Sequence, residues 1–145
     1  MSHTVPDTTR DAILADWIAR LNDLVDNVEA WAKSLDWSTR RIDKPMKDSI
    51  TGPYQAPGLL LQKDFTRILI DPISRSTPSS EGRVDIYLMP ALDDIVILYY
   101  DLGRWNIYDQ LSDNEPVPGD GDAPARPLTK ETFAEVLAGL TQNAA

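Results

Sequence analysis

The strongest constraint on the fold is the stretch Ile95–Tyr100, which reads Ile-Val-Ile-Leu-Tyr-Tyr and is apolar on both alternating faces. A strand with one face in water should alternate apolar and polar residues, so this segment predicts a strand that is covered on both sides. Segments 83–89 and 104–108 also have strand character, and only short turns separate the three. Parallel crossovers need longer connections, so we expect a buried antiparallel meander.

The connection 101–103 leaves the register of the last hairpin open between two forms. A three-residue loop with its glycine in the left-handed conformation is favoured, because leucine disfavours a positive φ. This loop places Trp105 beside Tyr99. A two-residue loop, formed by the leucine and the glycine alone, shifts the register by one residue and places Trp105 beside Tyr100.

A long amphipathic helix is predicted over residues 10–35, with Thr8 in the position of a capping box. Its apolar residues repeat at spacings of three and four, a heptad seam formed by Leu14, Trp17, Leu21, Leu24, Val28, Trp31 and Leu35. Ile18, Val25 and Ala32 widen this seam, which favours packing on a sheet over pairing with a second helix. A helix of about 26 residues is roughly 39 Å long, and five strands make a sheet roughly 20–25 Å wide. We therefore expect the ends of the helix to overhang the sheet, which makes Leu14, Trp17, Trp31 and Leu35 a possible interface.

The remaining elements complete an α+β fold. Strands are predicted at 39–46, 59–62 and 67–71, where nearby prolines limit the chain to edge positions or bulges. A short C-terminal helix follows Thr129 as its cap. We expect a single domain over residues 1–145, with a flexible tail at 1–9 and an acidic loop rich in Pro and Gly at 111–128. The predicted fold is a long N-terminal helix on a mostly antiparallel sheet of about five or six strands, with a short C-terminal helix.

Charge and composition restrict the partners of the chain. The formal net charge is -9 at pH 7, which disfavours binding to nucleic acid. Residues 40–47 form the one basic island, interpreted as a solvated edge or as a dock for an acidic partner or anionic ligand. No apolar run approaches the roughly 20 residues of a membrane span, and the polar start does not resemble a signal peptide. We expect a cytoplasmic protein that does not bind membranes.

Catalytic, metal-binding and cofactor motifs are missing from the sequence. The chain has no cysteine and one histidine, His3, which lies in the predicted tail. A fixed catalytic or metal-binding geometry is not expected there. The remaining catalytic option is a carboxylate-based hydrolase, with candidate acids Asp71, Asp85, Asp93, Asp94, Asp101 and Asp109. Surface and turn-forming roles explain these acids better than catalysis does, so we predict no enzyme activity, no cofactor and no metal site.

Aromatic residues on three consecutive strands are expected first as cross-strand core pairs, and they are also the best candidate binding site. Tyr87, Tyr99 and Trp105 combine large rigid rings with the cation of Arg104. The leading hypothesis is a small acidic protein-binding or adaptor module that holds a protein partner or forms a homodimer. A small-molecule-binding domain with these rings around a pocket is the alternative. In size, acidity and α+β content the chain is broadly similar to type III secretion chaperones and small immunity proteins, which implies a chaperone-like or immunity-like role without assigning residues.

Overall fold

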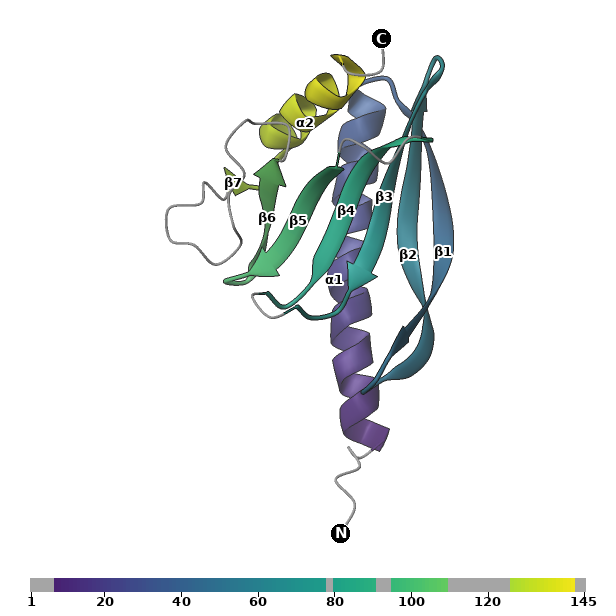
Figure 1. Ribbon diagram of the computed structural model, residues 1–145, viewed down its shortest axis with the longest axis vertical. Coiled ribbons are helices and arrows are strands. Elements are labelled where there is room, and N and C mark those ends of the chain that lie inside the picture. Colours follow the sequence, from purple (N-terminus) through teal and green to yellow (C-terminus); the bar gives the residue numbers. More distant parts are fainter. Residues whose placement is uncertain (1–6, 78–79, 91–94, 110–125, 143–145) are drawn as a thin grey trace.

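The computed structural model describes residues 7–77, 80–90, 95–109 and 126–142. Its elements are α1 (Asp7–Ser34), β1 (Ser38–Asp48), β2 (Gly52–Lys63), β3 (Thr66–Ser74), β4 (Arg83–Met89), β5 (Ile95–Asp101), β6 (Arg104–Asp109), β7 (Arg126–Pro127) and α2 (Lys130–Gln142). The predicted α+β fold is confirmed, with a sheet of seven described strands instead of five or six. Strands lie in the order of the sequence and every neighbouring pair is antiparallel (Figure 1).

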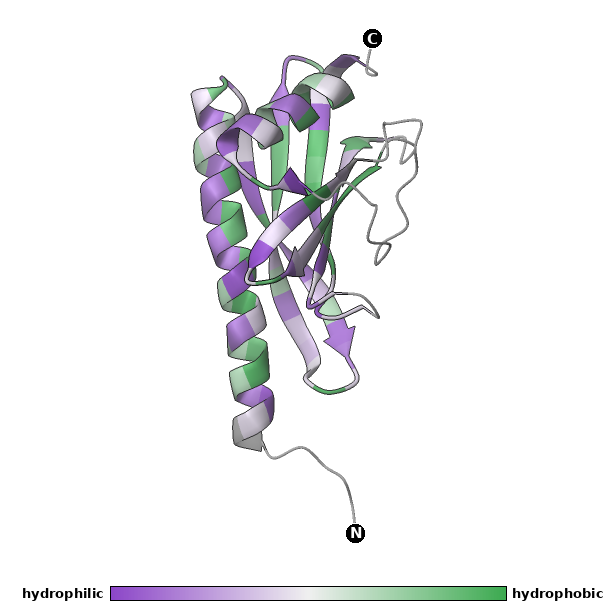
Figure 2. Ribbon diagram, turned by 90° about the vertical axis from the view of Figure 1, so that its left-hand side faces the viewer, coloured by the Kyte–Doolittle hydropathy of each residue, from purple (hydrophilic) through white to green (hydrophobic). Residues whose placement is uncertain are grey.

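Both helices contribute to one core on one side of the sheet. Figure 2 shows α1 running along this side. The buried residues of the α1 seam and of α2 join a single cluster with strand residues such as Leu59, Ile86 and Leu98, and Trp31 of α1 contacts Phe133 of α2 at 5.9 Å between ring centroids. The broad apolar stripe of α1 therefore packs on the sheet, as its width predicts.

The β1–β2 hairpin covers Trp17, one of the residues that we expected to overhang the sheet, while the first turns of α1 extend beyond the hairpin (Figure 1 and Figure 2). Its strands have 11 and 12 residues, longer than the predicted segments 39–46 and 59–62. Near its far end, the Tyr54 hydroxyl accepts a hydrogen bond of 3.1 Å from Trp17 Nε1, and Trp17 is only 1% exposed. Of the other residues proposed for a helix interface, Leu14, Trp31 and Leu35 are partly buried and pack against the core.

Prolines occupy places where a missing N–H donor is tolerated. Pro45 lies on the edge strand β1, and Pro53 and Pro57 precede Leu59, so they lie where β2 pairs with β1 alone. Pro72 lies at a register shift between β3 and β4, which is the bulge among the two predicted possibilities of an edge or a bulge.

The two predicted boundary segments are shorter than expected. Helix α1 begins at Asp7, so residues 7–9 belong to the helix and Thr8 is not its N-cap. Residues 1–6 of the predicted tail lie outside the described residues. Of the predicted loop 111–128, residues 126–127 form β7 against β6, and residues 111–125 are not described. Thr129 caps α2 as predicted, since its Oγ1 accepts a hydrogen bond of 3.1 Å from the Thr132 amide.

The last hairpin corrects the favoured register. Asp101 pairs with Arg104 and Tyr100 with Trp105, so the loop has two residues. Leu102 has φ 56° and Gly103 has φ 76°, the mirror-image turn whose twist matches that of the strands. The local preference of leucine against positive φ is outweighed by the pairing of the two strands. Trp105 therefore lies beside Tyr100 and not beside Tyr99.

Candidate functional site

One face of the sheet carries no described helix and bears polar and aromatic side chains, some of them exposed and others, such as Tyr99 at 8% exposure, buried. Registered neighbours across β3–β6 share a face, so Asp71, Asp85, Ile97 and Tyr108 form one row across it. A second row contains Arg83, Tyr99 and Asn106. We call this surface the helix-free face; alternation along the strands adds Arg67, Leu69, Tyr87 and Arg104.

Asp71 organises one half of the helix-free face. Its carboxylate accepts a hydrogen bond from Lys44 Nζ at 2.8 Å, and Lys44 also donates to the Pro72 carbonyl at 2.8 Å. The Tyr87 hydroxyl donates to the other Asp71 oxygen at 3.0 Å. Burial and the neighbouring Asp71 carboxylate raise the pKa of Tyr87 to about 12. Tyr87 is therefore a fixed, neutral hydroxyl donor over the physiological pH range.

Asp85 fixes the neighbouring part of the face. Arg83 makes a two-point ion pair with it, with Nε to Oδ1 at 2.8 Å and Nη2 to Oδ2 at 3.1 Å. The Asp85 hydrogen bond raises the pKa of Arg83, and Asp85 is only 6% exposed. This geometry holds the half-buried Arg83 guanidinium in one orientation. Tyr99, directly opposite Arg83 on β5, has its pKa raised by burial.

Two further contacts order the β5–β6 side of the face. Tyr99 and Tyr108 meet edge to face, with centroids 5.1 Å apart and planes at 82°. Arg104 Nε donates to Asn106 Oδ1 at 3.1 Å, and the Asn106 amide donates to the carbonyls of Asp101 and Arg104. Within the described part of the chain, Arg104 forms no ion pair, and neither does Arg67.

The predicted binding residues are divided between the two faces. Tyr87, Tyr99 and Arg104 lie on the helix-free face. Trp105 lies on the helix side, 6.2 Å from Trp17 and 5.3 Å from Tyr100 between ring centroids. The hairpin register decides this division, since a shift of one residue exchanges the faces.

The predicted binding set did not include Arg83, Asp85 or Tyr108, and Asp85 was predicted only as a candidate catalytic acid. The signal for two of them was present, because Arg83 and Asp85 alternate with apolar residues at the spacing that places them beside Tyr87. The face on which Tyr108 lies depends on the register of β6, and the three-residue loop that the sequence favoured gives the wrong register.

The basic island is only partly available to a partner. Arg41 pairs with Asp26 and Glu29 of α1, and the Arg41 hydrogen bond lowers the pKa of Glu29. Lys44 is held by Asp71 as described. Arg40 is exposed and shows no ion pair among the residues that the structure describes. Arg40 pairs with Leu60 of β2, so it lies at the β1 edge of the helix-free face.

Two of the carboxylates proposed for hydrolysis, Asp71 and Asp85, hold neighbouring side chains in place in this structure. Asp71 and Asp85 are register partners on one face, and each carries an ion pair with a cation of the same surface. Asp101 is exposed at a hairpin. Asp93 and Asp94 lie outside the described residues, and the side chain of Asp109 is not described. The arrangement positions tyrosine and arginine side chains and gives no specific support to the hydrolase hypothesis.

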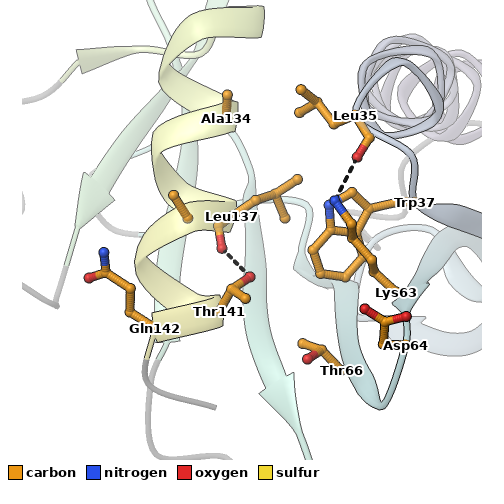
Figure 3. Close-up of a pocket in the computed structure, with 10 residues that line it drawn as sticks. Leu35, Trp37, Lys63, Asp64, Thr66, Ala134, Leu137, Thr141 and Gln142 are labelled. Carbon is orange, nitrogen blue, oxygen red and sulfur yellow. Dashed lines mark hydrogen bonds between the residues drawn. The ribbon is translucent and has the colours of Figure 1, made fainter. Parts of the chain in front are cut away.

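A separate apolar cavity of about 510 Å³ lies between α2 and the β2–β3 hairpin. Figure 3 shows Leu35 and Trp37 on one side of it, with Ala134, Leu137 and Thr141 of α2 on the other. Two of its polar side chains are bonded internally, since Lys63 Nζ donates to the Leu35 carbonyl at 3.1 Å and Thr141 Oγ1 to the Leu137 carbonyl at 2.6 Å. The rings that the small-molecule hypothesis expected, Tyr87, Tyr99 and Trp105, do not line this cavity.

Comparisons with known proteins add no family: no family model, no curated protein and no solved structure matches this chain. Among the described residues, no helix meets the combined requirements of length and apolarity for a membrane span.

Proposed function

We propose that this chain is a non-enzymatic protein-binding module that docks an acidic segment of a partner protein on its helix-free face. The observation that carries the proposal is the set of tyrosine and arginine side chains held in fixed positions by Asp71 and Asp85. Tyrosine and arginine are enriched among the residues that dominate binding energy at protein interfaces.

Fixed side chains favour binding because less conformational entropy is lost on association. Tyr99, itself only 8% exposed, supports the half-buried Tyr108 ring edge to face, and the Tyr87 hydroxyl is held by Asp71. Immobilising a free side chain at an interface costs roughly 0.5–1.5 kcal/mol, so side chains that are already ordered save much of this cost.

The arginines of the helix-free face favour an acidic partner, even though the exposed Asp101 lies opposite Arg104. Arg67 and Arg104 lie on the helix-free face without an ion pair among the described residues, and Arg40 extends this positive character to the β1 edge. The whole chain carries -9, so most of its surface repels an acidic partner. Attraction confined to one face would orient the partner during the encounter.

Site-specific photocrosslinking in cells of the source organism tests the proposal. The crosslinking residue is placed at the exposed position 104 on the helix-free face and, as the control, at the exposed position 130 at the start of α2. We expect a partner captured from position 104 and not from position 130. Capture of the same proteins from both positions would argue against the helix-free face.

Binding of the captured partner is then measured with two matched charge reversals. Arg104→Glu should weaken binding by at least about tenfold, the effect of losing one good interfacial charge contact, while Lys130→Glu leaves it unchanged. Equal affinities for the two variants, with the fold intact by circular dichroism, would refute the assignment of this surface.

A further inference from the structure

The tip of the β2–β3 hairpin exposes an aromatic ring. Lys63 pairs with Thr66, so Asp64 and Phe65 form a two-residue turn. Phe65 is fully exposed, with a relative exposure of 103%. Turn positions normally carry Gly, Pro, Asn, Asp or Ser. Full burial of a phenylalanine side chain is among the larger single hydrophobic contributions, and here that contribution is unused.

The same hairpin forms a wall of the apolar cavity. Asp64 and Thr66, which flank Phe65, both line the 510 Å³ cavity between the hairpin and α2. An apolar cavity of about 150 Å³ is sufficient to bind benzene, so this cavity can accept a phenyl ring. Phe65 itself lines a different hollow of about 350 Å³, together with Gln62, Arg67, Met89 and Pro90.

We propose that two copies of the chain pair through this end of the molecule, with Phe65 of each copy inserted into the 510 Å³ cavity of the other. A two-fold interface requires each surface patch to be complementary to itself. A projecting ring directly beside a cavity that can hold it meets this requirement. When the two-fold rotation places the ring of one copy in the cavity of the other, it also places the second ring in the first cavity.

Charge at the cavity rim also fits a second copy. Lys63 and Asp64, of opposite charge, line the cavity side by side (Figure 3). These two charges cancel, whereas the whole chain carries -9. Repulsion between two copies is therefore weaker here than over an average part of the surface. The proposal uses a different surface from the helix-free face, so either can fail while the other holds.

Sedimentation analysis of the full chain tests the role of the ring. Phe65→Ser should raise the dimer dissociation constant by about 100-fold, about tenfold for each of the two rings withdrawn from a cavity. Leu102→Ser is the matched control, because Leu102 is 84% exposed at the tip of another two-residue hairpin. It should leave the dissociation constant unchanged. Equal constants for wild type and Phe65→Ser would overturn the proposal.

A blocked cavity gives an independent test. Ala138 lines the cavity and is exposed, so Ala138→Trp should fill the space and abolish pairing without disturbing the core. A mixture of Phe65→Ser, whose cavity is free, and Ala138→Trp, whose ring is free, should form heterodimers detectable by native mass spectrometry. Failure of the mixture to associate overturns the reciprocal geometry. A wild-type chain that remains monomeric up to about 100 µM would also overturn the proposal, because even small interfaces associate in this concentration range. This outcome counts against pairing even if the cavity binds a small molecule.

Discussion

Substitution of Gly82 by alanine should destabilise the fold through one defined steric conflict. A Cβ atom at this position would lie 2.6 Å from Trp17 Cζ3, whereas ordinary contacts begin at 3.4 Å. The ring or the backbone must therefore move by about 0.8 Å (3.4 − 2.6). Both are held: Trp17 is 1% exposed and bonded to Tyr54, and the Gly82 carbonyl accepts a hydrogen bond of 2.9 Å from the Tyr100 amide.

Overpacking of this kind costs roughly 1–3 kcal/mol. For a chain of this size the melting temperature of Gly82→Ala should fall by roughly 3–10 °C, measured by calorimetry and by urea unfolding. A double-mutant cycle isolates the cause. Trp17→Phe removes the ring atoms that meet the new methyl group, so Gly82→Ala should cost about 1 kcal/mol less in that background. The same cost in both backgrounds would refute the steric explanation.

Three further predictions follow from individual side chains. Burial and Asp71 raise the pKa of Tyr87 to about 12. The stability that this shift contributes should therefore be complete below pH 10 and lost as the pH rises through 12. In a titration of tyrosine ionisation followed at 295 nm, Tyr87→Phe should remove the last tyrosine to ionise. Leu102 has φ 56°, so Leu102→Gly should stabilise the fold by about 1 kcal/mol in urea unfolding; a loss of stability would contradict this. Burial alone would raise the pKa of Asp48, but hydrogen bonds from Arg75 and from two backbone amides lower it. Its contribution is present above its unfolded pKa and lost as the pH falls through its folded value, so Asp48→Asn should flatten the acid limb of the stability curve measured below about pH 5.

Local patterns predicted most of the elements of this fold. The heptad seam of α1 and the apolar face of α2 follow from side-chain spacing, which a helix converts directly into a buried stripe. The bulge at Pro72 follows from its missing N–H. These features depend on residues close in sequence, so no knowledge of the rest of the chain is needed to predict them.

The candidate site was only partly predictable because it depends on register. Tyr87, Tyr99 and Arg104 were identified as binding residues from their chemistry, and strand alternation groups them on one face. Trp105 was assigned with them, and the two-residue loop places it on the other face. Single-residue preference at Leu102 pointed to the wrong loop, because pairing along the whole of β5 and β6 outweighs the strain of one residue.

The sequence by itself determined most of the helix and strand segments, though not β7 or the full length of β1 and β2, and that the sheet is antiparallel. Periodicity and short connections are local properties. Only the tertiary structure decided how the apolar surface is covered. The length of the β1–β2 hairpin covers Trp17 with Tyr54, and the position of α2 opposite Trp37 creates a cavity beside an exposed phenylalanine. Burial and cavities arise from contacts between distant segments, and residue spacing carries no information about those contacts.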